Sequence, residues 1–479
     1  MVNSVYNTAT HMGRIKKIHF VGIGGAGMSG IAEVLHNQGY LVSGSDNQSS
    51  DITDRLSALG AKIFIGHKTS QVDGADAVVV SSAIPKDNPE YSSAIENRIP
   101  VVQRAEMLAE LMRYRYGIAV AGTHGKTTTT SLIASVFYEA QFDPTFIIGG
   151  LLNSSASNAK LGASRYLIAE ADESDASFLH LQPMLTVLTN VDRDHLVNYE
   201  GSFKKLQQAF IKFIHNLPFY GLLVACIDDP ITKVILSRVN RPIITYGFDQ
   251  EADYRATDYK QSGFVSTFTV RKKNDPEEAV FLQLNMPGAE NVQNALASFA
   301  VASEEGIAIE KIISGIESFG GVSRRFQHHG TFSIDQGQFM LVDDYGHHPN
   351  EVRSVIAAIR NGWPDSRLIM VYQPHRYSRT LEMFESFVDV LSSVDHLFLL
   401  ETYAAGEEPL KGAGSKDLFN QLKLKTSVSV EFVESIQRIP SMLESRIRPG
   451  DLVVTQGAGE TAQIARNLTQ RWQREEIVL

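Results

Sequence analysis

A glycine-rich segment with a lysine follows the apolar run at residues 118–121, and it constrains this chain more than any other feature. The segment reads Gly122, Thr123, His124, Gly125, Lys126, Thr127, with further threonines after it. In a phosphate-binding loop, backbone amides cradle the phosphates, the lysine neutralises their charge, and the next hydroxyl can coordinate Mg²⁺. The strict pattern requires glycine where Val120 stands, so this loop is a variant. The segment predicts a nucleoside triphosphate site at the start of a helix, rather than a glycine-rich turn with a chance lysine.

A second glycine-rich segment follows the apolar run at residues 18–21. Gly22, Gly24 and Gly27 match the pattern GxGxxG, which lets a backbone turn tightly and approach a diphosphate at a helix N-terminus. Asp46 follows the third glycine by 46 − 27 = 19 residues, where a dinucleotide fold places its ribose-binding acid. These residues leave three interpretations open: an NAD site, a turn without a ligand, or a site for another nucleotide diphosphate. The presence of two nucleotide motifs in one chain favours the third.

Acidic residues gather where two other apolar runs end. The run at 166–169 leads into Glu170, Asp172, Glu173 and Asp175, and the run at 185–189 leads towards His195. The carboxyl ends of strands in α/β sheets line the ligand crevice, so these carboxylates are candidates to hold Mg²⁺ beside the phosphate loop. The alternative is a solvent-exposed acidic turn. His195 is a candidate metal ligand or phosphate contact, although a lone histidine is more often structural.

The order of apolar and amphipathic stretches predicts an α/β fold. Buried strands are expected at residues 18–21, 41–43, 77–80, 118–121, 166–169, 185–189, 223–227, 341–343, 368–372, 397–400 and 452–455. Strict alternation within residues 246–286 predicts an antiparallel hairpin region. Boundaries near residues 113–116 and 320–323 would divide the 479 residues into domains at 1–113, 114–322 and 323–479, which are of ordinary size.

Composition excludes several classes of protein. The chain has 44 Lys and Arg against 54 Asp and Glu, which gives a net charge of −10. Because the chain is acidic and has no basic run, we do not expect it to bind nucleic acid or an anionic membrane non-specifically. The single cysteine, Cys226, rules out an intramolecular disulfide and a cysteine-rich zinc site. Residues 1–12 do not read as a signal peptide, and the longest apolar stretch, 217–227, is interrupted by Pro218 and Gly221 and is too short to span a bilayer. We therefore expect a cytoplasmic protein without membrane insertion, as a monomer or a dimer.

Motifs along nearly the whole chain resemble the Mur ligases, the ATP-dependent amino-acid ligases of peptidoglycan synthesis. The resemblance rests on the segments that begin at Gly22, Arg104, Gly122, Glu170, Asn216, Arg324, Asp343 and Gln373. As a set they are most similar to the first enzyme of the series. The resemblance implies an N-terminal Rossmann-like domain for a UDP-sugar, a central P-loop-type domain for ATP and Mg²⁺ (Mn²⁺ may substitute), and a C-terminal Rossmann-like domain that closes over them with the amino acid. The substrates implied are UDP-N-acetylmuramate, L-alanine and ATP.

The resemblance also implies roles for individual residues. The UDP-sugar would contact Gly22, Gly24, Gly25, Ala26, Gly27, Met28, Ser29, Asp46 and Ser82. ATP would contact Gly122, Thr123, His124, Gly125, Lys126, Thr127, Thr128, Asn291, Asn294, Arg325 and Asp344, with the two asparagines at the adenine. The metal would be held by Thr127, Glu170 and His195. The amino acid would contact Tyr345, His347, Arg376 and Arg379, and the catalytic residues would be Lys126, His347, His348, Arg376 and Arg379.

Two positions depart from the family's usual pattern. Glu290 stands where the family usually has histidine, beside the expected adenine contact. Val197 stands where the family usually has an aspartate, two residues after His195. A valine supplies neither the charge nor the hydrogen bonds of that carboxylate.

The implied chemistry is amide formation through an acyl phosphate. A carboxylate becomes reactive towards an amine when phosphorylation turns one of its oxygens into a good leaving group. His347 and His348 are candidate bases for the amine, because histidine titrates near neutrality, and positioning roles for both stay open. Three alternatives remain: a ligase that recycles murein tripeptide onto the same UDP-sugar, an NAD-dependent oxidoreductase based on Gly22, Gly24, Gly27 and Asp46, and a non-catalytic nucleotide-binding regulator.

Overall fold

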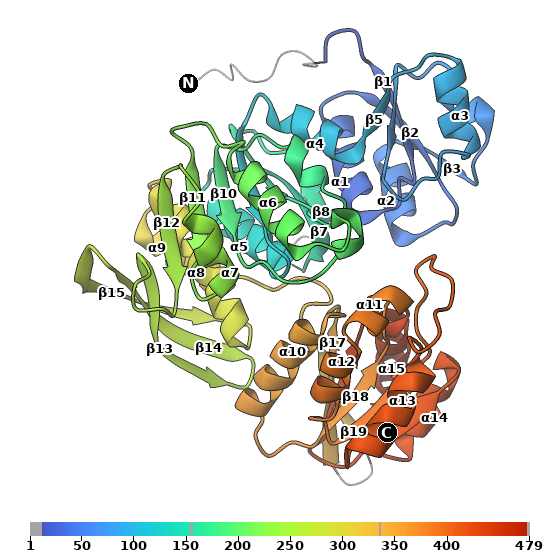
Figure 1. Cartoon of the computed structure of the whole chain (residues 1–479), viewed down its shortest axis with the longest axis vertical. Helices are drawn as coiled ribbons and strands as arrows, with labels where there is room; N and C mark the ends of the chain where they lie inside the picture. Colours follow the sequence, from blue (N-terminus) through green and yellow to red (C-terminus); the bar gives the residue numbers. More distant parts are fainter. Residues whose placement is uncertain (1–11, 154–156, 335–336, 477–479) are drawn as a thin grey trace. The chain divides into compact units, whose positions relative to one another are not determined.

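The computed structural model describes residues 12–153, 157–334 and 337–476. Their strands form three sheets of five, ten and six strands (Figure 1). The chain divides into two compact units: one holds Met1–Thr257, Thr269–Leu282 and Gln293–Gly320, and the other holds Asp258–Phe268, Gln283–Val292 and Gly321–Leu479. The predicted three-domain α/β class is confirmed. The residue boundaries of the three domains stay a prediction.

The five-stranded sheet has the order β3-β2-β1-β4-β5, and all its neighbours are parallel. Its strands are β1 (Lys17–Val21), β2 (Leu41–Asp46), β3 (Lys62–Ile65), β4 (Ala77–Val80) and β5 (Val101–Gln103). Its helical segments are α1 (Ala26–Asn37), α2 (Asp51–Leu59), η1 (Thr69–Val72), α3 (Pro89–Glu96) and α4 (Arg104–Met112). The strand order reverses between β1 and β4. Ligands of open α/β sheets bind outside the carboxyl ends of the strands at such a point.

The ten-stranded sheet has the order β15-β14-β13-β12-β11-β10-β6-β9-β7-β8. Its strands are β6 (Tyr116–Ala121), β7 (Thr145–Leu152), β8 (Ser157–Lys160), β9 (Tyr166–Glu170), β10 (Leu185–Leu188), β11 (Leu222–Cys226), β12 (Ile243–Gly247), β13 (Tyr254–Ser262), β14 (Val265–Lys272) and β15 (Asp275–Leu284). The helical segments along it are α5 (Lys126–Glu139), η2 (Ser177–His180), η3 (Leu196–Tyr199), α6 (Phe203–Ile214), α7 (Pro230–Leu236), α8 (Ala289–Glu304) and α9 (Ile309–Glu317). β6 is parallel to both β9 and β10, so their carboxyl ends share one edge.

The first helix of the chain also packs against the ten-stranded sheet. α1 lies against β7 and β8, and a Cβ at Gly30 would lie 3.1 Å from the Ile147 side chain and 3.3 Å from the Ala159 Cβ. The missing side chain therefore lets the helix approach the sheet closely. This contact belongs to one continuous buried cluster that joins α1 to the core around β6, β9 and β10.

The six-stranded sheet belongs to the second unit and has the order β16-β17-β21-β18-β19-β20. Its strands are β16 (Gln327–Ile334), β17 (Gly337–Asp344), β18 (Leu368–Tyr372), β19 (His396–Leu400), β20 (Ser429–Val433) and β21 (Leu452–Gln456). Its helical segments are α10 (Pro349–Gly362), α11 (Tyr377–Glu382), α12 (Phe384–Leu391), α13 (Ser415–Lys425), η4 (Ile436–Arg438), α14 (Ile439–Glu444) and α15 (Thr461–Glu476). β16 is antiparallel to β17, and the other neighbours are parallel. Aromatic contacts among Phe264, Phe326 and Trp363 add to the core of this unit.

Every apolar run that the sequence indicated as a strand forms one. Within residues 246–286, β13 and β14 are neighbours joined by the two residues 263–264, and a connection that short joins antiparallel strands. Among the described residues, no helix is long and apolar enough to cross a membrane. Cys226 is buried at the end of β11, and burial raises the pKa of its thiol to about 12.

Candidate functional site

The glycine-rich loop after β6 has a backbone that only glycine can supply. Gly122 has φ +135° and Gly125, the N-cap of α5, has φ +82°. A Cβ at Gly122 would lie 2.0 Å from the Thr189 hydroxyl oxygen, and one at Gly125 would lie 2.6 Å from the Asn294 amide oxygen. The loop is therefore a tight cradle at a helix N-terminus, which is the backbone arrangement that binds phosphate.

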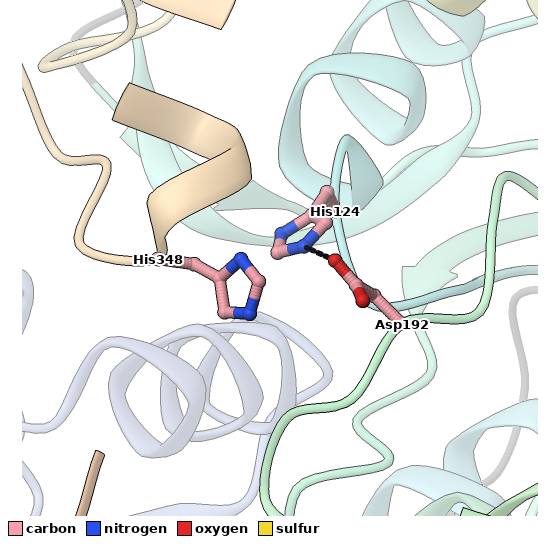
Figure 2. Close-up of side chains that lie close together, drawn as sticks. All are labelled: His124, Asp192 and His348. Atoms are coloured by element: carbon pink, nitrogen blue, oxygen red, sulfur yellow. Dashed lines mark hydrogen bonds and ion pairs between the residues drawn. The ribbon is translucent and has the colours of Figure 1, made fainter. Parts of the chain in front are cut away.

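Residues after β10 hold this loop in place. The His124 amide donates to the Asn190 side chain (2.9 Å), and the Thr189 hydroxyl donates to the His124 carbonyl (2.6 Å). The Asp192 amide donates to the Thr123 hydroxyl (2.9 Å). The His124 Nε2 lies 3.2 Å from the Asp192 carboxylate, and Figure 2 shows this hydrogen bond. The carboxyl end of β10 thus fixes the loop that follows its neighbour β6.

Lys126 is the buried cation of the loop. Its ammonium donates to the Gly122 carbonyl (2.6 Å), to the Thr123 carbonyl (3.1 Å) and to the Glu173 carboxylate (2.7 and 3.0 Å). Burial acts to lower the pKa of Lys126, but the nearby carboxylates outweigh burial and raise it. Burial raises the pKa of Glu173 to about 7, with the ammonium acting in the opposite direction. The structure thus keeps a positive charge on the loop, as the predicted phosphate contact requires.

Three residues could hold a divalent cation beside the loop. Thr127 follows the lysine, and Glu170 ends β9, where its carboxylate accepts a hydrogen bond from the Gly149 amide (2.6 Å). His195 has a left-handed backbone (φ +56°), and its Nε2 lies 3.4 Å from the Asp194 carboxylate. Val197, which has no carboxylate, is 76% exposed. The carboxylate beside His195 is therefore that of Asp194. A hydroxyl, a carboxylate and an imidazole are donors that fit a divalent cation.

The glycine loop after β1 is tied to the end of β2. The amides of Gly22 and Ile23 donate to the Ser45 carbonyl (2.8 and 3.0 Å), and the Gly24 amide donates to the Asp46 carboxylate (2.9 Å). Asp46, expected at a ribose, therefore braces the loop in this structure, and its ribose contact stays a prediction. The glycine loop therefore lies between β1 and the start of α1, where the sequence predicted a diphosphate-binding loop.

The remaining residues of the predicted UDP-sugar set are differently placed. Met28 and Ser29 are buried in α1, and the Ser29 hydroxyl accepts from the Asn158 side chain (3.0 Å). Their side chains pack within the protein. The Ser82 hydroxyl donates to the Asp175 carboxylate (2.7 Å), which links the turn after β4 to the acidic segment after β9.

Arg104, at the start of α4, lies between Gly27 of the first glycine motif and the acidic segment after β9. Its guanidinium is ion-paired with Asp172 (2.9 Å) in the acidic segment. The same guanidinium occupies the space beside Gly27, where a Cβ would lie 2.9 Å from its nearest nitrogen. A cation thus lies between the predicted diphosphate loop and the carboxylates that surround Lys126.

In the second unit, predicted residues meet at the carboxyl ends of β17, β18 and β21. Asp344 is buried and accepts from the amides of Phe326 (2.9 Å) and Gly346 (2.7 Å). Burial raises its pKa, while the Arg325 guanidinium and these amides act the other way. Arg325 lies over the Tyr345 ring, 5.2 Å from its centroid. The structure therefore brings Arg325, Asp344 and Tyr345 together as one cluster.

The two predicted histidines, His347 and His348, have different surroundings. The His347 Nδ1 lies 3.3 Å from the Tyr345 carbonyl, which can only accept, so the neutral ring carries its proton on Nδ1 and a lone pair on Nε2. His348 is buried and caps α10, where its Nδ1 accepts from the Asn350 amide (3.2 Å). The neutral His348 ring therefore has its proton on Nε2. Of the two, His347 has the tautomer that leaves Nε2 able to accept a proton.

The two predicted arginines, Arg376 and Arg379, lie at the start of α11. Arg379 is 5% exposed and its guanidinium lies 3.2 Å from the His375 ring nitrogen. Arg376 has φ +72° and lies 3.7 Å from the Glu407 carboxylate. The His347 and His375 rings are 5.3 Å apart. These contacts place the His375 ring beside both Arg379 and His347, whereas the Arg376 side chain is directed to Glu407.

The predicted adenine contacts lie at the start of α8. The Asn291 side chain donates to the Pro287 carbonyl (2.7 Å), and the Asn294 side chain accepts from the Thr129 hydroxyl (3.0 Å). Glu290, which departs from the family pattern, accepts from the Ser354 hydroxyl (2.8 Å). In this structure Asn294 supports α5 and the phosphate loop, so its adenine contact stays a prediction.

Three family models together match residues from the start of β1 to the region after β21. They are the Mur ligase family catalytic domain at residues 17–116, the Mur ligase middle domain at 120–302 and the Mur ligase glutamate ligase domain at 324–459. The chain belongs to the Mur ligase family. This Mur ligase has the lysine of the glycine-rich loop, the acidic strand end and the predicted histidines and arginines on the elements described above.

Solved structures of similar proteins agree with this assignment. A UDP-N-acetylmuramate-alanine ligase from Thermotoga maritima is 28% identical, with 96% of this chain and 99% of that chain covered and a TM-score of 0.82. A murein peptide ligase from Psychrobacter arcticus is 24% identical, with 95% and 98% covered and a TM-score of 0.71. A UDP-N-acetylmuramate:L-alanyl-gamma-D-glutamyl-meso-diaminopimelate ligase from Neisseria meningitides is 26% identical, with 65% and 100% covered and a TM-score of 0.59.

The predicted site of this Mur ligase lacked several residues that the structure adds. They are Arg104, Asn190 and Asp192. Asn190 and Asp192 come shortly after the buried strand β10, so their position at the carboxyl edge of a sheet was a usable signal. Arg104 had no such signal, because its contact with Asp172 depends on how α4 lies against the acidic segment.

We expect Gly27→Val to weaken UDP-sugar binding by this Mur ligase about tenfold or more while leaving ATP affinity within twofold. A side chain at residue 27 would displace the Arg104 guanidinium from its contact with Asp172 and add bulk beside the diphosphate loop; a tenfold change corresponds to about 1.4 kcal/mol. Separate calorimetric titrations with the UDP-sugar and with ATP measure the two affinities. An equal loss of both affinities would contradict the assignment of the two loops to two ligands.

Proposed function

We propose that this Mur ligase joins L-alanine to the lactyl carboxylate of UDP-N-acetylmuramate, with ATP converted to ADP and phosphate. The observation that carries the proposal is the buried Lys126 on its glycine-rich loop, opposite the acidic end of β9. The likeness to the Thermotoga maritima alanine ligase, along 96% of this chain, supports the choice of substrates. Family membership favours a ligase over the NAD-dependent alternative, which leaves Gly125, Lys126 and Thr127 without a role.

The reaction proceeds in two displacements. A lactyl carboxylate oxygen attacks the γ-phosphorus of ATP, the bond from that phosphorus to ADP breaks, and an acyl phosphate forms. The neutral amine of L-alanine then attacks the acyl carbon, the carbon–oxygen bond to phosphate breaks, and inorganic phosphate departs with the electron pair. The amine loses one proton, which restores a neutral amide. Each step transfers a group that ATP has activated, so no oxidant or reductant takes part.

Lys126 stabilises the first displacement. Negative charge spreads over the equatorial oxygens of the transferring phosphoryl group, and a preorganised cation in a site shielded from water stabilises that charge strongly. The carbonyls of Gly122 and Thr123 and the Glu173 carboxylate already orient the ammonium. Its reorientation towards a bound phosphate therefore requires only a change of hydrogen-bond partner.

Thr127, Glu170 and His195 would hold the divalent cation. When bound, Mg²⁺ neutralises phosphate charge and aligns the β- and γ-phosphates. Glu170 is anchored through the Gly149 amide and His195 through Asp194, so both donors are held by the protein itself. Mn²⁺ can take the same oxygen and imidazole donors.

His347 accepts the proton from the alanine amine. The neutral His347 ring donates from Nδ1 to the Tyr345 carbonyl, so Nε2 is the nitrogen that would take up the proton. His348 caps α10 and fixes the segment that carries His347. Arg376 and Arg379 supply guanidinium forks for a carboxylate or a phosphate. ATP and a UDP-sugar are substrates of the cytoplasm, where we place the enzyme, as a monomer or a dimer.

Phosphate release from ATP tests the proposal. The enzyme is incubated with Mg²⁺, ATP and UDP-N-acetylmuramate, with and without L-alanine, glycine, L-serine or murein tripeptide. We expect release that requires both the sugar and L-alanine, and a product heavier by one alanyl residue. Because discrimination of one methyl group is worth about 1–3 kcal/mol, some turnover with glycine is expected. Release that occurs only with the tripeptide would assign the recycling reaction instead, and no release with any acceptor would contradict a ligase.

A further inference from the structure

A buried ionic cluster lies beneath the first glycine loop, away from the ATP site. Glu90, on α3, is fully buried and accepts a hydrogen bond from the Ser45 hydroxyl (2.5 Å) at the end of β2. The same carboxylate lies 2.9 Å from the His67 Nδ1 and 3.4 Å from the His19 Nε2. His19 comes from β1, and His67 follows β3. Side chains from α3, β1, β2 and the segment after β3 therefore converge on one carboxylate.

The cluster keeps a charge in the interior of the domain. Glutamate is almost never fully buried unless it is paired. Burial alone would raise the pKa of Glu90, but hydrogen bonds from His19, Ser45 and His67 outweigh burial and lower it. The carboxylate is therefore ionised at neutral pH. A carboxylate held so firmly fixes the position of every group that donates to it.

Ser45 connects this carboxylate to the glycine loop. Its side chain donates to Glu90, while its own carbonyl accepts from the amides of Gly22 and Ile23. The next residue, Asp46, accepts from the Gly24 amide. Two consecutive residues at the end of β2 thus hold three consecutive amides of the loop. Of these two residues, Ser45 is the one whose side chain is anchored in the buried cluster.

We infer that Glu90 is a positioning residue for the UDP-sugar: through Ser45 it sets the conformation of the loop at Gly22–Gly24 that receives the nucleotide diphosphate. The inference rests on the proposed function, because it takes that loop as the UDP-sugar site. Glu90 itself is buried and acts on the loop through Ser45. Loss of its charge should therefore weaken sugar binding without changing the chemistry at Lys126.

Glu90→Gln tests the inference, because glutamine has the same shape without the charge. Ser45→Ala is the second variant, and it removes the hydroxyl that joins the loop-holding residue to Glu90, together with its contact to the His67 Nδ1 (3.0 Å). Glu96→Gln is the matched control, because Glu96 lies on the same helix and is exposed. Calorimetry measures the Kd of UDP-N-acetylmuramate and of ATP for each full-length variant. Phosphate release then gives kcat and the KM for each substrate.

We expect Glu90→Gln to raise the Kd and KM for the UDP-sugar about tenfold, with kcat and the ATP affinity within twofold of the starting enzyme. Ser45→Ala should raise the same constants, and the double variant should be no worse than Glu90→Gln alone, because both act through one contact. Glu96→Gln should change nothing.

Two results would overturn the inference. One is an unchanged sugar Kd in Ser45→Ala, which remains informative if Glu90→Gln fails to fold. The other is a matching loss of sugar affinity, ATP affinity and kcat in both variants, since a purely structural role would lower all three. If the unmodified enzyme binds no UDP-N-acetylmuramate, the proposed function fails first, and the inference fails with it.

Discussion

Lys126→Ala is expected to lower turnover by about a thousandfold while UDP-N-acetylmuramate still binds. Removal of one preorganised charge that stabilises a transition state costs about 3–4 kcal/mol, and Lys126 is the cation that the loop carbonyls and Glu173 orient. Phosphate release measures turnover, and calorimetry measures sugar binding. The sugar should bind normally because its loop follows β1, whereas Lys126 follows β6.

The control for Lys126→Ala concerns Glu173, which loses its ion-pair partner in that variant. Without Lys126, Glu173 is a buried carboxyl without its ammonium, and the loss of one partner of a buried pair is destabilising. Lys126→Ala combined with Glu173→Gln removes both charges, so it should recover thermal stability without recovering turnover. Recovery of turnover in the double variant would show that the single change acted through misfolding. Loss of sugar binding in a folded single variant would contradict separate sites.

The strands that the sequence predicted are those with continuous apolar runs. β4, β6, β9 and β18 are buried along most or all of their length, so each appears as an unbroken apolar segment. β3 and β5 were not predicted. They lie at the two edges of their sheet and are short and partly exposed, so their side chains carry little of that signal.

The positions of the two loops were predictable, but the partners of their residues were not. A glycine pattern after an apolar run specifies a strand, a tight turn and a helix N-terminus. Which of four carboxylates would meet Lys126 depends on the turns after β9, and Glu173 is the one that does. Similarly, no local pattern indicated that the Asp46 carboxylate accepts a hydrogen bond from the Gly24 amide, and its ribose contact stays a prediction. Contacts between residues far apart in the chain depend on the register of neighbouring strands, which no local pattern specifies.

Buried polar clusters are hidden from sequence patterns for the same reason. Glu90 appears in the chain as an ordinary acid in the first turn of a helix. Its burial follows from the packing of α3 over the sheet, which brings it to Ser45 and His67. The residues that the sequence did not indicate, such as Glu90 and Asn190, are therefore those that orient other groups.

Gly122→Ala is expected to lower the free energy of unfolding by about 2–4 kcal/mol and to lower turnover at least tenfold. A backbone at φ +135° is strained for any residue with a Cβ, at about 1–3 kcal/mol. The added methyl would also lie 2.0 Å from the Thr189 hydroxyl oxygen and 3.0 Å from the Asn190 carbonyl oxygen. The loop must therefore move. Because Thr189 and Asn190 anchor His124, that movement displaces the loop amides that are proposed to bind the phosphates.

Gly306→Ala separates the effect of backbone strain from the effect of the close contact with Thr189 and Asn190. Gly306 also has a positive φ (+72°), but nothing lies within 4 Å of its missing Cβ. It should therefore show backbone strain alone, about 1 kcal/mol, with turnover unchanged. Chemical denaturation measures both free energies, and the ATP KM reports the geometry of the loop. If Gly122→Ala proves as mild as Gly306→Ala in both measurements, then the close approach of β10 to the loop is not what shapes the ATP site.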